Sequence, residues 1–344
     1  EALSLAGWDD FPRRQVAARK AGRHLGIGLA NFVKGTGRGP FESVTVRVGP
    51  SGKVHVYSGA AAMGQSTKTM LAQVVAEQLG ADIANISVTT GDTGTISMGL
   101  GGSNSRQAVM AGSSAHVAAT RVREKALQVA SQALEVSERD LEIEGRDIRV
   151  KGSDLKLDIG RAARSIAGTA GYTLPGGMAP GLEATEHVVI DAMAYTNGTA
   201  VVELEVDVET GAVRIEKLVF VHDCGRVLHP VIVEGQLIGG IAHGIGNALF
   251  EWMRYDENAQ PITSTLADYL LVSATEVPPI VLGHLESPTP LNPLGVKGVG
   301  ECGVVPIAAA VASAIEDALS PYNVRITRTP ITPSDIVALI TEAK

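Results

Sequence analysis

Glycine is the feature of this sequence that most restricts its fold, since 39 of the 344 residues are glycine while aromatic residues make up only 4%. Glycine reaches left-handed backbone conformations and lets two backbones approach closely, so this content predicts many tight turns and close main-chain contacts. Three glycine-bounded loops, at 64–66, 101–105 and 297–301, each lead into a predicted helix. We therefore expect much of the chain to lie against a ligand through its main chain.

The hydropathy pattern switches between the strand and helix periods along the chain. Helical spacing of apolar residues predicts helices at 67–79, 107–133, 231–250 and 304–319, and a last helix that begins near Ser334 as its N-cap. Strand-like alternation around turn residues predicts hairpins at 42–58, 141–150 and 201–220, a strand at 86–90 and a turn at 222–230. These elements predict an α+β fold of two lobes, each made of small mixed sheets covered by helices. The expected parts are an N-terminal helical segment at 1–25 and lobes at 26–180 and 181–344, with the boundary in the Gly- and Pro-rich stretch 168–180.

Charge and hydropathy exclude several classes of partner. The formal net charge is −8, from 29 Lys and Arg against 37 Asp and Glu, and the chain has no basic run that would neutralise a phosphate backbone. No stretch approaches the roughly 18 apolar residues of a membrane span, and no signal-peptide pattern is present. We expect a cytoplasmic protein without nucleic acid or membrane partners. Because Glu1–Gly7 has no initiator Met and is typical of a helix interior, we also expect a fragment or a processed chain.

Cysteine usage limits the redox groups that the chain can hold. Cys224 and Cys302 are its two cysteines, which excludes a disulfide framework and falls short of the four thiolates that an iron–sulfur cluster usually needs. Any such cluster is expected on another polypeptide. His222, Asp223 and Cys224 suggest a nucleophilic cysteine with a base, but adjacent side chains point in different directions, and a buried structural thiol is favoured.

The glycine loops become specific only in combination. Each alone is more typical of a simple turn and helix cap, and none matches a dinucleotide fingerprint or a P-loop. Together with other short segments they form an ordered series: Ala62-Met63-Gly64-Gln65, Gly91-Asp92-Thr93, Gly102-Ser103-Asn104-Ser105-Arg106, Asp223-Cys224-Gly225-Arg226, Glu234-Gly235-Gln236, Asp268-Tyr269, and the stretch from Asn292 to Glu301. From about Gly26 onward this series resembles the molybdopterin-binding part of the xanthine oxidase and aldehyde oxidoreductase family, with Lys297-Gly298-Val299-Gly300-Glu301 as its most specific element.

The resemblance implies a cofactor and a set of site residues. Molybdenum would be held by a molybdopterin, in its cytosine dinucleotide form, with no metal ligand from the protein and with the cofactor-binding loops between the two lobes. Glu301 would be the catalytic base, taking a proton from a water-derived oxygen that attacks the substrate. The implied cofactor contacts are Gly64, Gln65, Ser66, Gly102, Ser103, Asn104, Ser105, Arg106, Gln236, Lys297, Gly298, Val299 and Gly300.

The resemblance also implies partners and a reaction class. The substrate would be a small aldehyde, N-heterocycle or other aromatic compound, hydroxylated with water as the oxygen source. Electrons would leave through iron–sulfur clusters and FAD on partner chains. The N-terminal half of the family's large subunit has no counterpart here, so that half or an equivalent subunit is expected as a partner. Two departures from the family pattern are Cys302-Gly303, where many relatives have Pro-Pro, and Ser66, where Gly is more usual.

Glu301 also suggests a function without the family. A carboxylate between Gly300 and Cys302, ahead of an apolar helix, is positioned by its neighbours, although it could simply complement the dipole of that helix. Two other functions remain open: a cofactor-carrier or assembly module that binds without turnover, and a metal-free hydrolase that uses Glu301 and a bound water.

Overall fold

The computed structural model describes residues 1–168, 170, 173–174 and 177–343. Its contacts divide the chain into two compact units, each assembled from stretches that are separate in the sequence. Unit 1 comprises Glu1–Lys34, Tyr195–Ser287 and Val299–Lys344, and unit 2 comprises Gly35–Ala194 and Pro288–Gly298. The predicted boundary at 168–180 falls partly outside the described residues, and the division at 26–180 and 181–344 stays a prediction.

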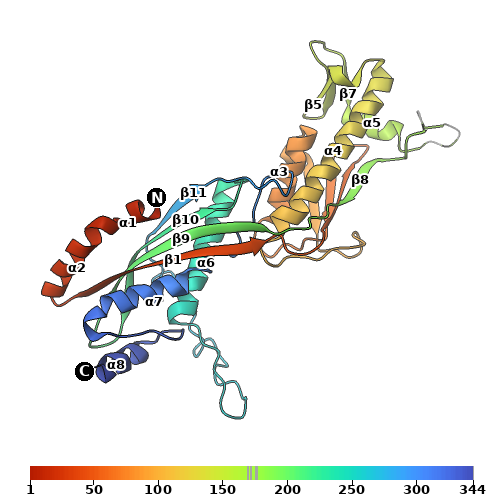
Figure 1. Ribbon diagram of the computed structural model, residues 1–344. Helices are drawn as coiled ribbons and strands as arrows, with labels where there is room; N and C mark the ends of the chain where they lie inside the picture. The colour runs from red at the N-terminus through yellow and green to blue at the C-terminus, as the bar shows by residue number, and fades with distance from the viewer. Residues whose placement is uncertain (169, 171–172, 175–176, 344) are drawn as a thin grey trace. The chain divides into compact units, whose positions relative to one another are not determined.

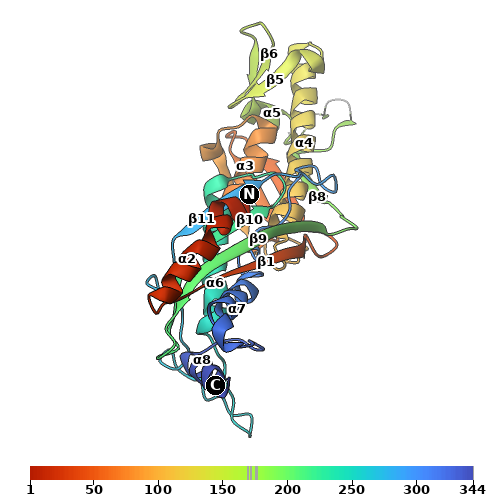
Figure 2. The same ribbon diagram turned by 60° about the vertical axis from the view of Figure 1, so that its left-hand side comes forward.

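Unit 1 is built on a four-stranded sheet of order β1-β9-β10-β11, in which β9 and β10 are antiparallel and β10 and β11 are parallel. Figures 1 and 2 show α1 and α2 on one face of this sheet, and α6 and α7 on the other. The elements are α1 (Ala2–Ala6), α2 (Phe11–Lys20), β1 (His24–Thr36), β9 (Ala194–Val206), β10 (Val213–Asp223), α6 (Pro230–Leu249), β11 (Ile280–Leu285), α7 (Ile307–Ala318) and α8 (Pro333–Glu342), with short 3-10 turns at Trp8–Asp10 and Ser320–Tyr322.

The two faces of this sheet carry separate hydrophobic cores. Val202 and Phe220 belong to the larger core, which also contains apolar side chains of α6, α7 and α8. Val201 and Val219, their neighbours in sequence, pack with α1 on the opposite face. Successive side chains of a strand point to opposite faces, so β9 and β10 are apolar on both sides because helices cover both sides.

Strand β1 lies against α7 with almost no space between the two backbones. A Cβ atom built on Gly26 would come within 1.9 Å of the Ala314 carbonyl oxygen, and one on Gly28 within 2.1 Å of the Ala310 carbonyl oxygen. Only glycine permits this approach. The sequence pattern did not predict β1, because glycines occupy positions between its apolar residues, and glycine in a strand interior weakens the strand signal.

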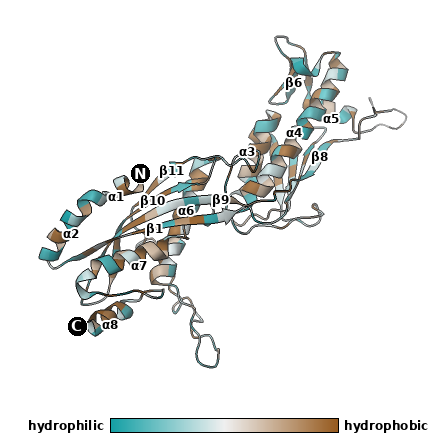
Figure 3. Ribbon diagram, in the orientation of Figure 1, coloured by the Kyte–Doolittle hydropathy of each residue, from teal (hydrophilic) through white to brown (hydrophobic). Residues whose placement is uncertain are grey.

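Unit 2 contains a second four-stranded sheet, of order β4-β3-β2-β8, and a small antiparallel sheet of order β5-β6-β7. Helices α3 and α4 pack side by side, with α4 against β2 and β8 and α3 against β4. Figure 3 shows hydrophobic and hydrophilic patches alternating along α4, as expected of a helix with one buried face. The elements are β2 (Ser43–Val48), β3 (Val54–Ser58), α3 (Thr67–Leu79), β4 (Ile86–Thr90), α4 (Gln107–Leu134), β5 (Leu141–Glu144), β6 (Asp147–Val150), β7 (Lys156–Asp158), α5 (Ile159–Ser165) and β8 (Leu182–His187), with 3-10 turns at Ile83–Asn85 and Glu138–Asp140.

The predicted α+β class is confirmed, and so is the placement of most elements. The helix at 67–79 and the strand at 86–90 have the predicted bounds. Among the described residues, no helix combines the length and the apolar composition that crossing a membrane requires.

Three local predictions were wrong. The predicted turn at 222–230 begins as strand, because β10 continues to Asp223 in parallel register with β11. Helix α7 begins at Ile307 rather than 304, after a run of turns that ends at its N-cap Pro306. The N-cap of α8 is Thr332 rather than Ser334, because Thr332 and Asp335 form a reciprocal capping box.

Candidate functional site

The first glycine loop, residues 62–66, is closed by the side chain of Gln65. Its Oε1 accepts a hydrogen bond from the Met63 N–H at 2.5 Å, and its Nε2 donates to the Ala61 carbonyl at 3.2 Å. Ser66 follows in a left-handed conformation (φ 63°) and is the N-cap of α3 without a side-chain capping bond. The Gln65 amide thus folds the loop back on itself at the start of α3.

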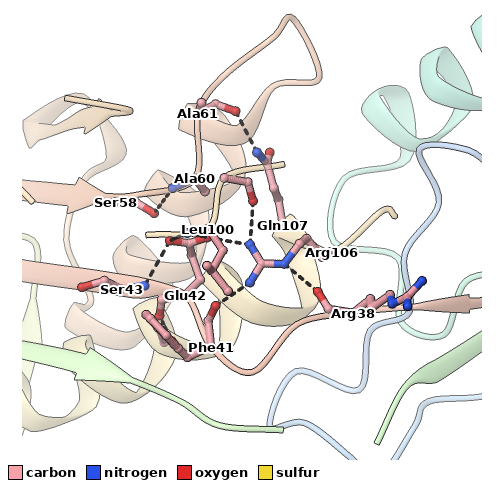
Figure 4. A network of polar contacts seen from close by, with 12 residues as sticks. Arg38, Phe41, Glu42, Ser43, Ser58, Ala60, Ala61, Leu100, Arg106 and Gln107 are labelled. Carbon is pink, nitrogen blue, oxygen red and sulfur yellow. Dashed lines mark hydrogen bonds and ion pairs between the residues drawn. The ribbon is translucent and has the colours of Figure 1, made fainter. Parts of the chain in front are cut away.

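Gln107, which the sequence analysis did not select, connects the first glycine loop to the second. It is the first residue of α4 and is 8% exposed. Its Oε1 accepts from Gln65 Nε2 at 2.6 Å and from the Thr67 hydroxyl. Its Nε2 donates to the Ala61 carbonyl at 2.7 Å (Figure 4). A polar residue at a buried helix position was the signal available in the sequence, but its partners are about 40 residues away and are brought near only by folding.

The second glycine loop, residues 99–106, contains two consecutive non-glycine residues in left-handed conformation, Asn104 (φ 48°) and Ser105 (φ 49°). Ser103 is exposed at its tip, while Asn104 and Ser105 are half-buried. Non-glycine residues adopt this conformation at an energetic cost, so the surrounding structure must hold them in it. Such backbone geometry is enriched at ligand-binding sites.

The third loop meets the second at Gly298, within unit 2. A Cβ atom on Gly298 would lie 2.1 Å from the Ser105 carbonyl oxygen, so glycine is required for this contact. The Gly298 N–H donates to the Thr36 hydroxyl at 2.9 Å, and that hydroxyl donates to the Ala194 carbonyl at 2.7 Å. Three segments distant in sequence thereby converge beside Ser105.

Arg106 differs from the other predicted contacts, because its side chain is 2% exposed. Its guanidinium is paired with the buried Glu42 and donates to main-chain carbonyls of the same unit. The structure therefore gives this guanidinium an internal supporting role. A cofactor contact by Arg106 stays a prediction. Because the guanidinium is buried against other groups, such a contact would involve the main-chain atoms of Arg106.

Glu301 lies in the turn between Gly300 and α7, with its side chain 47% exposed. Lys34 Nζ, on β1, lies 2.7 Å from Glu301 Oε2, and the Lys34 side chain is only 16% exposed. Glu301 precedes the first residue of α7 by six positions, and the first turn of α7 contains no acidic residue. A role as a charge that complements the helix dipole is therefore disfavoured, since that effect falls off within the first turn.

The predicted site residues are distributed over both units. Those in unit 2 are Gly64, Gln65, Ser66, Gly102, Ser103, Asn104, Ser105, Arg106, Lys297 and Gly298. Those in unit 1 are Val299, Gly300, Glu301 and Gln236, the last of which is half-buried on α6. The Lys297–Glu301 stretch thus crosses from one unit to the other between Gly298 and Val299.

The two thiols are buried and poorly suited to nucleophilic chemistry. Burial, with the nearby Cys302 and Asp223, raises the pKa of Cys224 to about 12. Burial raises the pKa of Cys302 to about 11, while a hydrogen bond between its thiol and the Thr196 hydroxyl lowers it. Since the thiolate is the nucleophilic form, the expectation of a structural thiol at Cys224 is favoured.

Comparison with known proteins decides the family. A model of the molybdopterin cofactor-binding domain matches residues 1–278. The chain belongs to this family. Over 98% of its length the chain is 38% identical to the 6-hydroxypseudooxynicotine dehydrogenase complex subunit gamma of Paenarthrobacter nicotinovorans. Over 97% of its length it is 36% identical to the nicotine 6-hydroxylase large subunit of the same organism. The chain covers 42% of the length of each of these relatives. Among solved structures, quinoline 2-oxidoreductase from Pseudomonas putida 86 matches with a TM-score of 0.90 and 36% identity, over 99% of this chain and 45% of that one.

The chain spans less than half the length of these relatives. It corresponds to the C-terminal-type half of a molybdenum hydroxylase large subunit, which confirms the resemblance inferred from the motifs. As a member of the molybdopterin cofactor-binding domain family, it is a molybdopterin-binding chain.

The geometry of unit 2 fits an anionic pterin cofactor. Helices α3 and α4 each begin directly after a glycine loop, and neither Ser66 nor Arg106 caps its helix through the side chain. The N-terminal ends of helices carry partial positive charge and orient N–H groups outward, which favours phosphate. The exposed Ser103 adds a hydroxyl that can hydrogen-bond to a polar group.

Proposed function

We propose that this chain is the molybdopterin-binding part of a molybdenum hydroxylase that oxidises an N-heterocyclic aromatic substrate with water as the oxygen source. The proposed catalytic role rests on the position of Glu301. Its carboxylate is half-exposed, lies in a turn outside the helix that follows, and is held at 2.7 Å by Lys34. A carboxylate in this setting is available to accept a proton, which is the task of a general base.

The names of the relatives favour the N-heterocyclic class over aldehydes. Nicotine 6-hydroxylase and quinoline 2-oxidoreductase are named for compounds that contain an aromatic ring nitrogen. Such a nitrogen withdraws electrons from the neighbouring carbon and makes it open to attack by an oxygen nucleophile. An aldehyde is the second candidate substrate, since its carbonyl carbon is electrophilic for a similar reason.

Different residues of this chain have different roles in the proposed reaction. When bound, the molybdenum cofactor supplies the two-electron redox chemistry. Glu301 accepts a proton at its carboxylate, and Lys34 orients that carboxylate. The loops at 62–66 and 99–106 hold the pterin and its phosphate groups, with Gln65 and Ser103 as the side chains that we expect to contact the cofactor. The cytosine dinucleotide form and the contact by Gln236 belong to the same proposal.

The proposed function requires partner proteins. Iron–sulfur and FAD subunits carry the electrons away, and the N-terminal half of the large subunit, or its equivalent, completes the substrate pocket. The segment 252–271 of unit 1 supports a protein partner, because it exposes several large apolar side chains: Trp252, Met253, Tyr255, Ile262, Leu266, Leu270 and Leu271. A cytoplasmic location is part of the proposal.

The test uses the natively purified complex, a panel of substrates and a dye as electron acceptor. We expect about one molybdenum per chain, dye reduction with quinoline- or pyridine-type compounds, and product oxygen derived from isotopically labelled water. Dye reduction separates the hydroxylase from a hydrolase, which also takes oxygen from water but releases no electrons. Molybdenum without turnover on any compound would instead support the carrier function.

A further inference from the structure

A buried ion pair joins the start of β2 to the start of α4. Arg106 Nη1 lies 2.6 Å from Glu42 Oε2, and the two side chains are 2% and 0% exposed (Figure 4). Removing two charges from water is costly, and apolar residues of similar volume often stabilise a fold as well or better. The geometry that the pair imposes therefore explains its presence better than stability does.

The pair ties the second glycine loop to the segment 38–43 at several main-chain atoms. Arg106 donates through Nε to the Arg38 carbonyl at 2.8 Å, through Nη1 to the Gly101 carbonyl at 2.6 Å, and through Nη2 to the Phe41 carbonyl. The Glu42 carboxylate accepts from the Leu100 N–H at 3.2 Å. Both ends of the loop are thus fixed to one buried charge pair.

Close packing around Glu42 fixes the backbone at Gly99, where the second glycine loop begins. A Cβ atom on Gly59 would lie 2.4 Å from Glu42 Oε1 and 2.5 Å from Gly99 Cα, and one on Gly99 would lie 2.6 Å from Gly59 Cα. The carboxylate therefore contacts two glycine backbones directly. Its Oε1 also accepts from the Ser43 N–H at 3.2 Å, which fixes the carboxylate itself.

The part of the loop between these anchors is strained. Asn104 and Ser105 both adopt left-handed conformations, which are unfavourable for non-glycine residues and persist only where the surroundings enforce them. With Leu100 and Gly101 held on one side and Arg106 on the other, the intervening residues have few alternatives.

We propose that Glu42 and Arg106 are positioning residues, which set the backbone of residues 99–105 in its cofactor-receptive conformation before the cofactor binds. The conformational entropy of the loop is then lost when the protein folds rather than when it binds the cofactor, which raises the affinity for the cofactor. This inference rests on the proposed function in assigning the loop to the cofactor. Neither side chain touches the cofactor; both act through the loop.

The first test measures hydrogen exchange on the cofactor-free full-length protein. Arg106→Lys keeps the charge but loses the planar set of donors to three carbonyls, and Glu42→Gln keeps the volume but loses the charge. We expect exchange of the amides at 99–105, Leu100 included, to accelerate by about 10-fold or more in both variants, as follows from leaving buried groups unpaired. Strands β2 and β3 should exchange as in the wild type.

The matched control is Arg47→Lys, which alters an ion pair with Glu183 in the same unit, where both side chains are about half-exposed. It should leave the exchange of the loop at the wild-type rate. Equal acceleration in the loop and in β2 and β3 would overturn the proposal, because it would show that the buried pair supports the whole unit rather than the loop. Unchanged exchange in Arg106→Lys and Glu42→Gln would overturn it as well.

The second test measures how fast the assembled complex loses molybdenum on dialysis. Arg106→Lys and Glu42→Gln should lose it about 10-fold faster than the wild type, and Arg47→Lys at the wild-type rate. Mobile loops with unchanged retention would contradict the positioning role. Absence of molybdenum from the wild-type complex would instead refute the proposed function, and the exchange experiment would still decide whether the pair fixes the loop.

Discussion

Lys34 Nζ lies 2.7 Å from Glu301 Oε2, so a strand in the N-terminal part of the chain holds the carboxylate that we propose as the catalytic base. Lys34 is near the end of β1, and its side chain is mostly buried, whereas the Glu301 carboxylate is half-exposed. The Glu301 carboxylate is therefore held by a contact with β1, a strand from the other end of the chain.

Glu301→Gln should abolish most turnover and leave cofactor binding intact. The amide keeps the shape of the side chain but cannot accept the proton, so turnover per molybdenum should fall by about 10² to 10⁴, the usual contribution of a general base. The measurement is steady-state turnover normalised to molybdenum content, with Glu209→Gln, in an exposed turn, as the control. Near-normal turnover per molybdenum in Glu301→Gln would refute the base assignment.

Lys34→Met should reduce turnover while changing stability little. The ion pair is partly exposed, and such pairs contribute only about 0.2 to 1 kcal/mol to stability. A misplaced carboxylate costs much more in rate, about 10- to 100-fold. Lys34→Arg, which keeps a cation beside Glu301, should recover part of the loss. If Lys34→Met and the wild type have equal turnover per molybdenum, Lys34 does not orient the base.

Gln107→Leu should lower cofactor occupancy more than it lowers turnover per bound molybdenum. The change leaves Gln65 Nε2, the Thr67 hydroxyl and the Ala61 carbonyl without this partner, at about 1 to 3 kcal/mol for each buried group that stays unpaired. Gln107→Glu keeps the acceptor for Gln65 and Thr67 and should have the milder effect. Molybdenum content at equal protein concentration measures the outcome, and full occupancy in Gln107→Leu would contradict the proposed link between the loops.

The stability of unit 1 should decrease as the pH falls below about 6.5. Burial lowers the pKa of His222 from 6.5 to about 4. His284, whose Nδ1 lies 2.7 Å from His222 Nε2, also lowers this pKa, while Asp223 opposes the shift. Between these two values the unfolded chain takes up a proton that the folded chain does not, so acid favours unfolding. The slope contributed by His222 is at most about 1.4 kcal/mol per pH unit.

Urea unfolding between pH 5 and 7 measures this dependence above the range where most carboxylates titrate. His222→Phe removes the buried titrating group and should flatten the slope in this window. His55→Phe, at a half-buried position on β3 of unit 2, serves as the control and should leave the slope unchanged. An identical slope in His222→Phe and the wild type would show that His222 is not its source.

The local pattern of the sequence was sufficient for most of the secondary structure. The α3 helix has its predicted bounds because its apolar spacing and the capping Gly80 both lie within the helix and its immediate neighbours. The motif series was likewise sufficient for the family, since short segments in a fixed order do not depend on knowing their contacts. Strand β1 was missed because Gly26 and Gly28 serve a contact with α7, and nothing local signals a partner almost 290 residues away.

The supporting contacts were decided by the tertiary structure alone. Glu42 and Arg106 are 64 positions apart, Gln65 and Gln107 are 42 apart, and Lys34 and Glu301 are brought together from opposite ends of the chain. The sequence presented Arg106 as one more polar residue in a cofactor motif, and only folding shows that its guanidinium is buried against a carboxylate. The physical reason is that burial and pairing depend on which distant segments pack together, whereas helix period, turn chemistry and motif order are properties of neighbouring residues.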